Sequence, residues 1–498
     1  MAVQFSGLAS GLDTDNIIKE LMKAERMKVD KVKKQKTKLE WRKDIWKEMN
    51  KKLYSFYTKQ VYNLRSKGTF MKKTTVSSND SIISAKANVN AAEGTHTLTV
   101  TQLAKASFLT GDKITKDKDN NDIDVEASTK ISELLDFGAD TEKMISITTQ
   151  KNGGTPVEIT IGKDDTMAQI VYNIKKAVAD VNISFDSNFD RVMMSSKNQG
   201  EDVKLQVGGD ANLIKALGLE GKVGTDGENS IFTYNGTELV SDSNEITVNG
   251  LTLTLKAKGD VNITVNQDTQ AMYDNVKDFI TEYNKILVEI NEKLGADRVV
   301  GYEPLTQDEK KAMSEDDIKL WEQKIKDSLL RRDDILTSLV DSMRSIVGSS
   351  SGVDTSGLDY RYLSELGIVT GKYTEKGILH IDGDEDDTLY AAKTNKLKEA
   401  IEQDPEKVAD LLNAIGDKLY SKMQEKMKST EISSAFTFFN DKQMDNQIDD
   451  YKDRITVLED KLTSIEERYY RQFTAMEKAI QMMNSQSASL ASMLGGSR

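Results

Sequence analysis

The residues best suited to chemistry form an acidic run at positions 381–388, with the sequence IDGDEDDT. Asp382, Asp384 and Asp386 occupy the first, third and fifth positions of a calcium-binding loop, where carboxylate oxygens bind the ion. The sixth position requires glycine but is Asp387, and the twelfth requires glutamate but is Lys393. The run therefore favours a solvated acidic turn over a calcium site, and we predict no metal site.

Other catalytic chemistry has little support. The chain has no cysteine, which excludes disulfides, zinc-thiolate sites, iron–sulfur clusters and thiol nucleophiles. Its two histidines, His96 in a threonine-rich run and His380 beside the acidic run, have no triad partners at a readable spacing. The segment SGLASG at 6–11 lacks the spacing of a nucleotide-binding glycine loop. We therefore expect no enzyme activity, no catalytic residue and no cofactor.

Length and composition indicate a folded, multidomain chain. A length of 498 residues is typical of about three domains, and 38% hydrophobic with 30% charged residues is compatible with folded cores. No apolar run is long enough to predict a membrane-spanning helix. The N-terminus lacks the basic and apolar regions of a cleaved secretory signal, so we expect either a cytoplasmic protein or export without a cleaved signal peptide.

A basic segment stands out from an acidic chain. The net charge is −13, yet positions 19–73 hold nineteen basic and six acidic residues. Such a segment fits either a nucleic-acid arm or a helix surface that binds acidic partners. Because Trp46 and Phe56 lie on an apolar seam, where aromatic rings pack instead of stacking on bases, we favour the helix surface and expect no nucleic-acid partner.

Long helices are predicted to position these residues at both ends of the chain. Asp13 is a suitable N-cap for an N-terminal helix over 13–62. Positions seven residues apart, each followed by a second position three residues later, form a heptad seam interrupted by polar residues. The apolar members of this seam, which we predict to form an assembly interface, are Ile18, Leu21, Val32, Leu39, Trp46, Met49, Leu53 and Phe56.

The C-terminal seam is more regular and predicts a helix over 447–494. Seven consecutive heptads follow one another without glycine or proline, so the helix is too long to bury its stripe inside a compact domain. We expect the N-terminal helix to cover it. Polar or small residues, Gln472, Ala479 and Gln486, fill three second-seam positions. The predicted interface residues are Ile448, Tyr451, Ile455, Leu458, Leu462, Ile465, Tyr469, Met476, Met483, Leu490 and Met493.

Between the two ends, the hydrophobic period changes from helical to alternating. Positions 74–110 predict strands with a turn at Glu93-Gly94, positions 111–130 a polar loop, and positions 144–207 short strands around a helix at 167–180. Asn249-Gly250 between two alternating runs predicts a hairpin with a type I′ turn. Helical periodicity returns at position 271, with helix starts at Ser314 and at Asp404-Pro405.

The order of elements predicts an α+β multidomain fold with terminal antiparallel coiled-coil legs, a helical middle domain and two inserted β-rich domains. We expect residues 1–70 and 441–498 to form the legs, and 271–440, with part of 50–75, the helical middle domain. Residues 76–110 and 230–270 should form an inner β domain, and 111–229 an outer one.

Several segments together resemble one known family. They are SGLASGLDTDNIIKELMKAER at the start, GTHTLTVTQLAKA, the strands around one helix between ISELLDFGAD and KLQVGG, SELGIVTGKYTEKGILHID with LKEAIEQDPEKVADLL, and QFTAMEKAIQMMNSQSASLASML at the end. In this order they resemble the bacterial flagellar filament cap family, the flagellar hook-associated protein 2 family. The segment at about 144–207 is similar to a motif inserted in flagellins and hook proteins.

The resemblance implies a structural cap at the distal end of the flagellar filament, outside the cell. Such a cap retains exported flagellin and promotes its folding and insertion. The implied partners are further copies of the chain in a ring of about five subunits, flagellin, the hook–filament junction proteins, the flagellar type III export apparatus, and an export chaperone at the C-terminal helix. The terminal helices would form legs that enter the open end of the filament.

Other classes of protein stay open from the residues alone. An extracellular adhesin or surface-layer protein would share the threonine-rich strands and the lack of cysteine, although it has no need of long heptad helices at both ends. A cytoplasmic scaffold that binds nucleic acid would explain the basic segment. An enzyme has the least support.

Overall fold

The computed structural model describes residues 13–151 and 154–495, with side chains as far as residue 491. The predicted interface residue Met493 and the segment 6–11 therefore lie outside the residues whose side chains are described. The chain forms two compact units, one of Met1–Phe70 with Thr269–Arg498 and one of Met71–Asp268. The two ends of the chain share one unit and the strands are inserted as the other, which confirms the predicted α+β multidomain fold.

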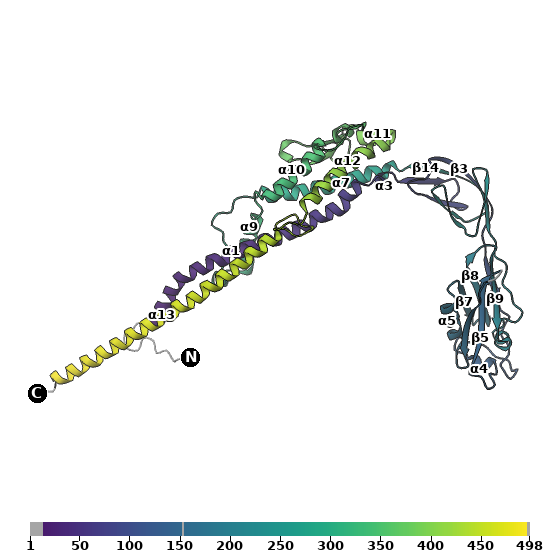
Figure 1. Cartoon of the computed structure of the whole chain (residues 1–498), viewed down its shortest axis with the longest axis horizontal. Helices are drawn as coiled ribbons and strands as arrows, with labels where there is room; N and C mark the ends of the chain where they lie inside the picture. Colours follow the sequence, from purple (N-terminus) through teal and green to yellow (C-terminus); the bar gives the residue numbers. More distant parts are fainter. Residues whose placement is uncertain (1–12, 152–153, 496–498) are drawn as a thin grey trace. The chain divides into compact units, whose positions relative to one another are not determined.

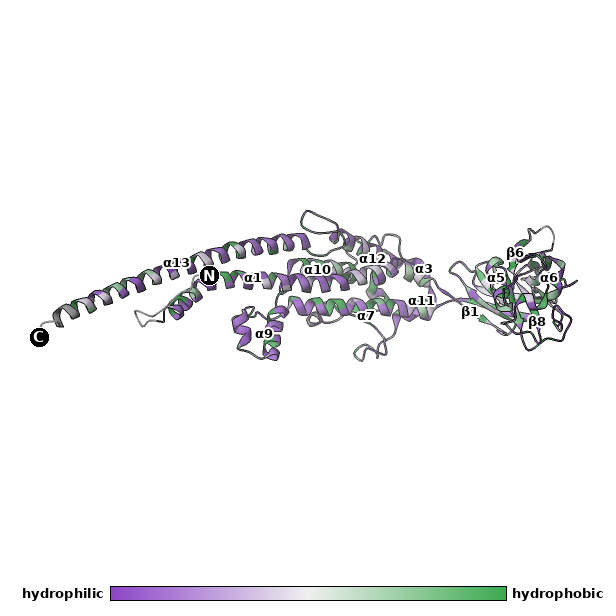
Figure 2. Cartoon of the chain, turned by 90° about the horizontal axis from the view of Figure 1, so that it is seen from below, coloured by the Kyte–Doolittle hydropathy of each residue, from purple (hydrophilic) through white to green (hydrophobic). Residues whose placement is uncertain are grey.

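The two terminal helices pair in an antiparallel manner. Helix α1 covers Thr14–Phe56 and begins at the predicted cap, where the Asp13 carboxylate accepts from the Asn16 backbone N–H. Helix α13 covers Asp441–Gly495 and lies beside α1 in both views (Figure 1, Figure 2). Ion pairs of Lys33 with Glu459 and of Lys43 with Asp445 set the alignment of the two helices.

A helical core packs against the second half of α1 and the short segments that follow it. After α1 the chain continues through a π-helical segment, Tyr57–Val61, and two short helices, α2 (Tyr62–Leu64) and α3 (Lys67–Phe70). The Phe56 ring of α1 stacks on Phe279 at 5.9 Å between centroids. The larger helices of this core are α7 (Thr269–Leu294), α10 (Asp334–Ser349), α11 (Lys396–Gln403) and α12 (Pro405–Lys426).

Smaller elements flank this helical core. A two-stranded hairpin joins β15 (Ile368–Thr370) to β16 (Leu379–Ile381), and short 3-10 segments cover Leu363–Leu366 and Tyr373–Glu375. Helices α8 (Gln307–Lys311) and α9 (Glu315–Asp327) lie beside α1. The predicted helix starts are confirmed: Ser314 caps α9, and Asp404 caps α12 with Pro405 in its first turn.

One half of the β unit consists of two antiparallel sheets that enclose a single core. A five-stranded sheet has the order β1-β14-β3-β10-β11 and a three-stranded sheet the order β12-β13-β2. Asn249 and Gly250 both have positive φ between β12 and β13, which confirms the predicted hairpin. The strands are β1 (Lys73–Ser77), β2 (Ile83–Ala87), β3 (Gly94–Gln102), β10 (Ser230–Tyr234), β11 (Thr237–Ser241), β12 (Glu245–Val248), β13 (Leu251–Leu255) and β14 (Gly259–Gln267).

The other half of the β unit has its own core. Two three-stranded sheets, β4-β8-β7 and β6-β5-β9, pack with helix α5 (Met167–Ala177), which begins at the Thr166 cap. The remaining elements are β4 (Ala106–Thr110), α4 (Ile131–Leu134), β5 (Glu142–Gln150), β6 (Val157–Gly162), β7 (Val181–Asp186), β8 (Arg191–Gln199), β9 (Val203–Gly209) and α6 (Ala211–Ala216).

Two local expectations about the strands need correction. The predicted turn at Glu93-Gly94 lies earlier, at 89–91, and Gly94 already begins β3, which pairs with β10 and β14 and not with β2. The polar segment 111–130 is also more than a solvated loop, because Ile114 and Val125 are buried in the core of this half.

Candidate functional site

The paired terminal helices are the candidate site. Helix α1 follows the first predicted seam position along its length, but the second position only in its second half. Six predicted residues, Ile18, Val32, Trp46, Met49, Leu53 and Phe56, are buried, and Leu39 is half-buried. Leu21, by contrast, is 40% exposed, while Met22 and Val29 are 2% and 4% exposed.

The expectation that Leu21 packs in the contact between the two helices of one chain is therefore wrong. In the first half of α1, the second buried residue of each heptad lies four positions after the first seam residue. The predicted seam places it three positions after. Because the helix turns every 3.6 residues, steps of three and four return to nearly the same face. Leu21 and Met22 are both apolar, so the position of α13 decides which of them is buried. An assembly role for Leu21 stays a prediction.

The seam of α13 is covered along most of its length. Ile448 is buried, and seven predicted residues are half-buried: Tyr451, Ile455, Leu458, Leu462, Ile465, Tyr469 and Met476. After Tyr469, Phe473 and Ile480 lie on the half-buried face in place of the predicted Gln472 and Ala479, which are exposed. Near this level α1 begins, and burial together with the nearby Asp15 carboxylate raises the pKa of Tyr470.

The end of α13 continues beyond the start of α1 (Figure 1, Figure 2). Every described side chain from position 481 to 491 is exposed. Met483 and Leu490, which continue the predicted seam, are 66% and 59% exposed, and the neighbouring Met482 is 63% exposed. This part of the helix therefore carries apolar side chains that nothing in the described chain covers.

Six of the basic side chains of α1 lie against acidic residues of other elements of the same chain. Besides the two pairs with α13, the Lys34, Lys38 and Lys52 ammonium groups lie 3.0, 2.7 and 2.7 Å from carboxylates of other elements. Those carboxylates belong to Glu309, Glu303 and Glu289. The basic segment thus acts as a surface for acidic partners, as favoured from the sequence.

A buried carboxylate joins α1 to the helical core. Asp333 caps α10 by accepting from the backbone N–H groups of Ile335 and Leu336, and its other oxygen accepts from Arg42 at 2.7 Å and from the Trp46 indole at 3.2 Å. The Asp333 side chain is 1% exposed. Sequence reasoning missed this residue, although an aspartate before an apolar helical run is the usual signal of an N-cap.

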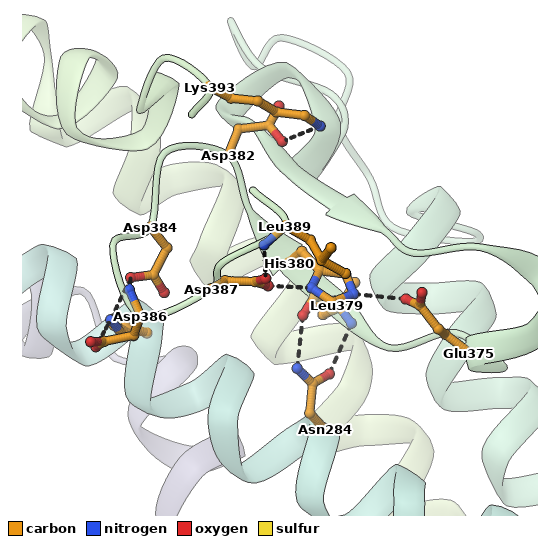
Figure 3. A network of polar contacts seen from close by, with 11 residues as sticks. Asn284, Glu375, Leu379, His380, Asp382, Asp384, Asp386, Asp387, Leu389 and Lys393 are labelled. Carbon is orange, nitrogen blue, oxygen red and sulfur yellow. Dashed lines mark hydrogen bonds and ion pairs between the residues drawn. The ribbon is translucent and has the colours of Figure 1, made fainter. Parts of the chain in front are cut away.

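Lysines hold the acidic turn, and Figure 3 shows one of them, Lys393, beside Asp382. Lys277 lies 2.6 Å from both Asp384 and Asp386, and Lys393 lies 2.9 Å from Asp382. Partial burial alone would lower the pKa of Lys277, but the two carboxylates raise it above its ordinary value. Among the described residues no cluster of acidic and histidine side chains fits a metal ion. Since ammonium groups hold these carboxylates, the turn joins α7 to the segment after β16.

Both histidines are enclosed by structural contacts. In Figure 3, His380 lies between Asp387 and Glu375, 2.5 and 2.8 Å from its two ring nitrogens. In the other unit, His96 contacts the Tyr234 hydroxyl at 2.9 Å and the Ala92 carbonyl at 3.0 Å. Neither ring contacts a serine or threonine hydroxyl among these hydrogen bonds.

No helix in the described part of the chain is both long and apolar enough to span a membrane.

Comparisons with known proteins point to one family. The family model described as "Flagellar hook-associated protein 2 C-terminus" matches residues 227–485, slightly more than half of the chain, and the model of the N-terminus of that protein matches residues 10–107. A flagellar hook-associated protein 2 of Halalkalibacterium halodurans is 28% identical over 98% of this chain and 99% of its own length. A B-type flagellar hook-associated protein 2 of Pseudomonas aeruginosa is 26% identical over 80% of each chain.

A solved structure shares the fold. The D1-D2-D3 domains of the flagellar cap protein FliD from Escherichia coli superpose with a TM-score of 0.52 at 21% identity, covering 77% of this chain and 97% of that one.

Proposed function

Because the chain belongs to the flagellar hook-associated protein 2 family, it is a structural filament-capping protein of the bacterial flagellum, and we propose that its paired terminal helices are the legs that hold the cap on the filament. Family membership favours this function over the adhesin or surface-layer alternative. The capping protein acts at the distal tip of the filament, outside the cell.

The observation that carries the proposal about the legs is the exposed apolar end of α13. Met482, Met483 and Leu490 are each more than half exposed on a helix that is otherwise paired. Exposed apolar side chains at the end of a paired helix favour burial against another protein. The half-buried seam before them has charged neighbours on both sides, so its contacts can exchange as each flagellin subunit inserts. The predicted seam residues of α1 and α13 are the proposed assembly interface.

The remaining partners are proposed at finer detail. The cap is a ring of about five copies that retains flagellin, promotes its folding and insertion, and meets the hook–filament junction proteins. The chain leaves the cell through the type III export apparatus without a cleaved signal peptide, and an export chaperone binds its C-terminal helix. The absence of cysteine supports this route, since no disulfide can form before export.

The four-domain division is also retained as a proposal. Its legs are 1–70 with 441–498 and its helical middle domain is 271–440, with part of 50–75. The inner β domain is 76–110 with 230–270, and the outer one is 111–229. Two separate hydrophobic cores within the β unit support the two β domains.

A strain that carries a shortened α13 tests the role of the legs. Removal of residues 481–498 leaves the ion pairs of Lys33 and Lys43 in place, so we expect a folded chain that no longer holds the tip. Electron microscopy should show short or absent filaments, with unassembled flagellin in the medium.

The matched control replaces exposed polar residues of the same segment that lie off the seam, as Gln481→Ser with Ser485→Ala, and should give normal filaments. Detection of the shortened chain in the medium separates loss of capping from loss of export. Normal filament growth with the shortened chain would refute the proposed leg contact.

A further inference from the structure

The face of α1 that points away from α13 is basic and incompletely neutralised. Lys34 and Lys38 are paired with Glu309 and Glu303, but Lys31 has no ion pair within the described chain, and Lys23 has only a 3.8 Å contact with the exposed Glu20.

These lysines, with Lys19 and Arg26, line a groove of about 930 Å³ between α1 and the segment 303–309. The carboxylates of Glu20, Asp30 and Asp308 line the same groove, so its cations only slightly outnumber its anions. Met27 lies in the same groove and is 68% exposed. The groove therefore combines uncovered apolar surface with cations that lack a full partner.

The face of α13 that points away from α1 is acidic. Asp453, Asp460 and Glu467 follow one another at intervals of seven residues, which places them on one stripe of the helix. All three are exposed, whereas the seam residues on the opposite side, such as Leu458, are half-buried. Within the described chain none of the three takes part in an ion pair shorter than 4 Å.

The two stripes lie at the same height along the leg. Lys33 lies opposite Glu459, and Lys43 lies opposite Asp445. Because the two helices are antiparallel, counting residues from these two contacts gives the range of α13 that lies opposite any residue of α1. Lys31 falls opposite 457–461, which includes Asp460, and Lys23 falls opposite 465–469, which includes Glu467. The match of opposite charges ends near Lys19, because the residue at the same position along the leg on α13 is the basic Arg471.

We propose that the incompletely paired lysines of this groove bind the acidic stripe of α13 of a neighbouring copy, with Lys23 beside Glu467 and Lys31 beside Asp460. The inference rests on the proposed function, because it takes the legs to run along the axis of a ring of identical chains. Copies related by rotation alone have no shift along the axis, so residues at equal height face each other.

A second copy fits these faces better than another occupant. The two stripes lie on opposite sides of the same leg, so they cannot pair within one chain. Each copy offers one of each, and such a head-to-tail contact repeats until the ring closes. Because the ion pairs are exposed, salt screens them, and the contact can form and release as the cap turns over.

Paired cysteines test the contact, since the natural chain has none. Full-length chains with Lys23→Cys and Glu467→Cys, or with Lys31→Cys and Asp460→Cys, are treated with a short bismaleimide at high protein concentration. We expect a ladder of covalent dimers and larger oligomers. The control, Lys33→Cys with Glu459→Cys, joins residues that lie 2.6 Å apart as an ion pair in one chain and should give cross-linked monomers.

Charge reversal gives a second, independent measurement. Lys23→Glu with Lys31→Glu should weaken self-association about tenfold at low salt, as should Asp460→Lys with Glu467→Lys. Combining all four reversals in one chain should restore association, and raising the salt concentration should remove the differences.

Monomers alone in the cysteine experiment, or cross-links to added flagellin without cross-links between copies, would overturn the inference. The inference would also be overturned if the chain with all four charge reversals associates no better than the two chains with two reversals each. A chain that caps filaments normally but shows either result refutes this contact and leaves the capping function intact.

Discussion

At the scale of single residues, Asp333 makes a buried charged contact that joins α1 to the helical core. Its carboxylate caps α10 and also accepts from Arg42 and Trp46 of α1, although the side chain is almost fully buried. Loss of this carboxylate would leave its buried partners without hydrogen bonds, and loss of the partners would leave the buried carboxylate without them. Both changes destabilise the folded chain. One residue thus connects the leg to the helical core.

Asp333→Ala is expected to lower the free energy of unfolding of the helical unit by about 3 kcal/mol, because a cap and a buried charged contact are lost together. Urea unfolding followed by circular dichroism measures the change. Asp334→Ala removes an exposed carboxylate one position later and should change stability by less than about 0.5 kcal/mol. Equal effects of the two substitutions would contradict the role of Asp333.

The Asp210 carboxylate is expected to make the stability of the β unit depend on pH in the acid range. Asp210 caps α6, and the Leu213 backbone N–H, followed by Lys143, holds the pKa of its carboxyl below the ordinary value. A lowered folded pKa stabilises the protein above the unfolded pKa of about 3.9, and that stability is lost as the pH falls through the folded pKa. Asp210 therefore contributes near neutral pH and loses its contribution in acid.

Asp210→Asn keeps a good capping side chain but removes the charge, so we expect a smaller loss of stability between pH 5 and pH 3 than in the natural chain. Asp210→Ala should cost about 1 kcal/mol at pH 7 through loss of the cap. Denaturant unfolding of the β unit at several pH values measures both effects. An unchanged pH dependence in the Asn variant would contradict the assigned cause.

At the scale of elements, the pairing of α1 with α13 selects which apolar residues of α1 are buried. Met22 and Val29 pack where a regular three-then-four heptad places Leu21 and Lys28. A helix can place either set on one face with little change in its own geometry. Its partner therefore decides the register.

Met22→Asp should loosen the first half of α1, because it places a charge in the contact with α13, whereas Leu21→Asp should leave that contact intact. Hydrogen exchange of the backbone over residues 14–32 reports this directly. We expect protection to fall by tenfold or more in the Met22 variant and to change little in the Leu21 variant. The reverse order would favour the heptad read from the sequence.

At the scale of the whole molecule, the β unit is an insertion whose two ends meet. Lys73, at the start of β1, pairs with Gln267, at the end of β14, so the chain enters and leaves the unit on adjacent strands. The unit also has two hydrophobic cores of its own. Adjacent ends and separate cores are typical of domains that fold alone.

A fragment of residues 71–268 should therefore fold without the helices and unfold at a temperature within a few degrees of one transition of the full chain. Differential scanning calorimetry of both chains makes the comparison. A fragment of residues 71–255 lacks β14, which lies between β1 and β3, and should not give a cooperative transition. Failure of the longer fragment to fold would show that the unit depends on the helices.

Local patterns in the sequence determined much of this protein. The caps at Asp13, Ser314 and Asp404, the turn at Asn249-Gly250 and the insertion of strands between terminal helices all depend on neighbouring residues or on hydrophobic period. The seam of α13 from Ile448 to Tyr469 belongs to the same group, because a long regular repeat leaves only one apolar face.

The tertiary structure alone decided the rest. Whether Leu21 or Met22 is buried, which strands pair with β3, and how Asp333 reaches Arg42 depend on residues far apart in the chain. The same holds for the acidic turn, whose carboxylates look free in the sequence until Lys277 of α7 lies beside them. Contacts of this kind are set by packing between elements, and no local spacing records them.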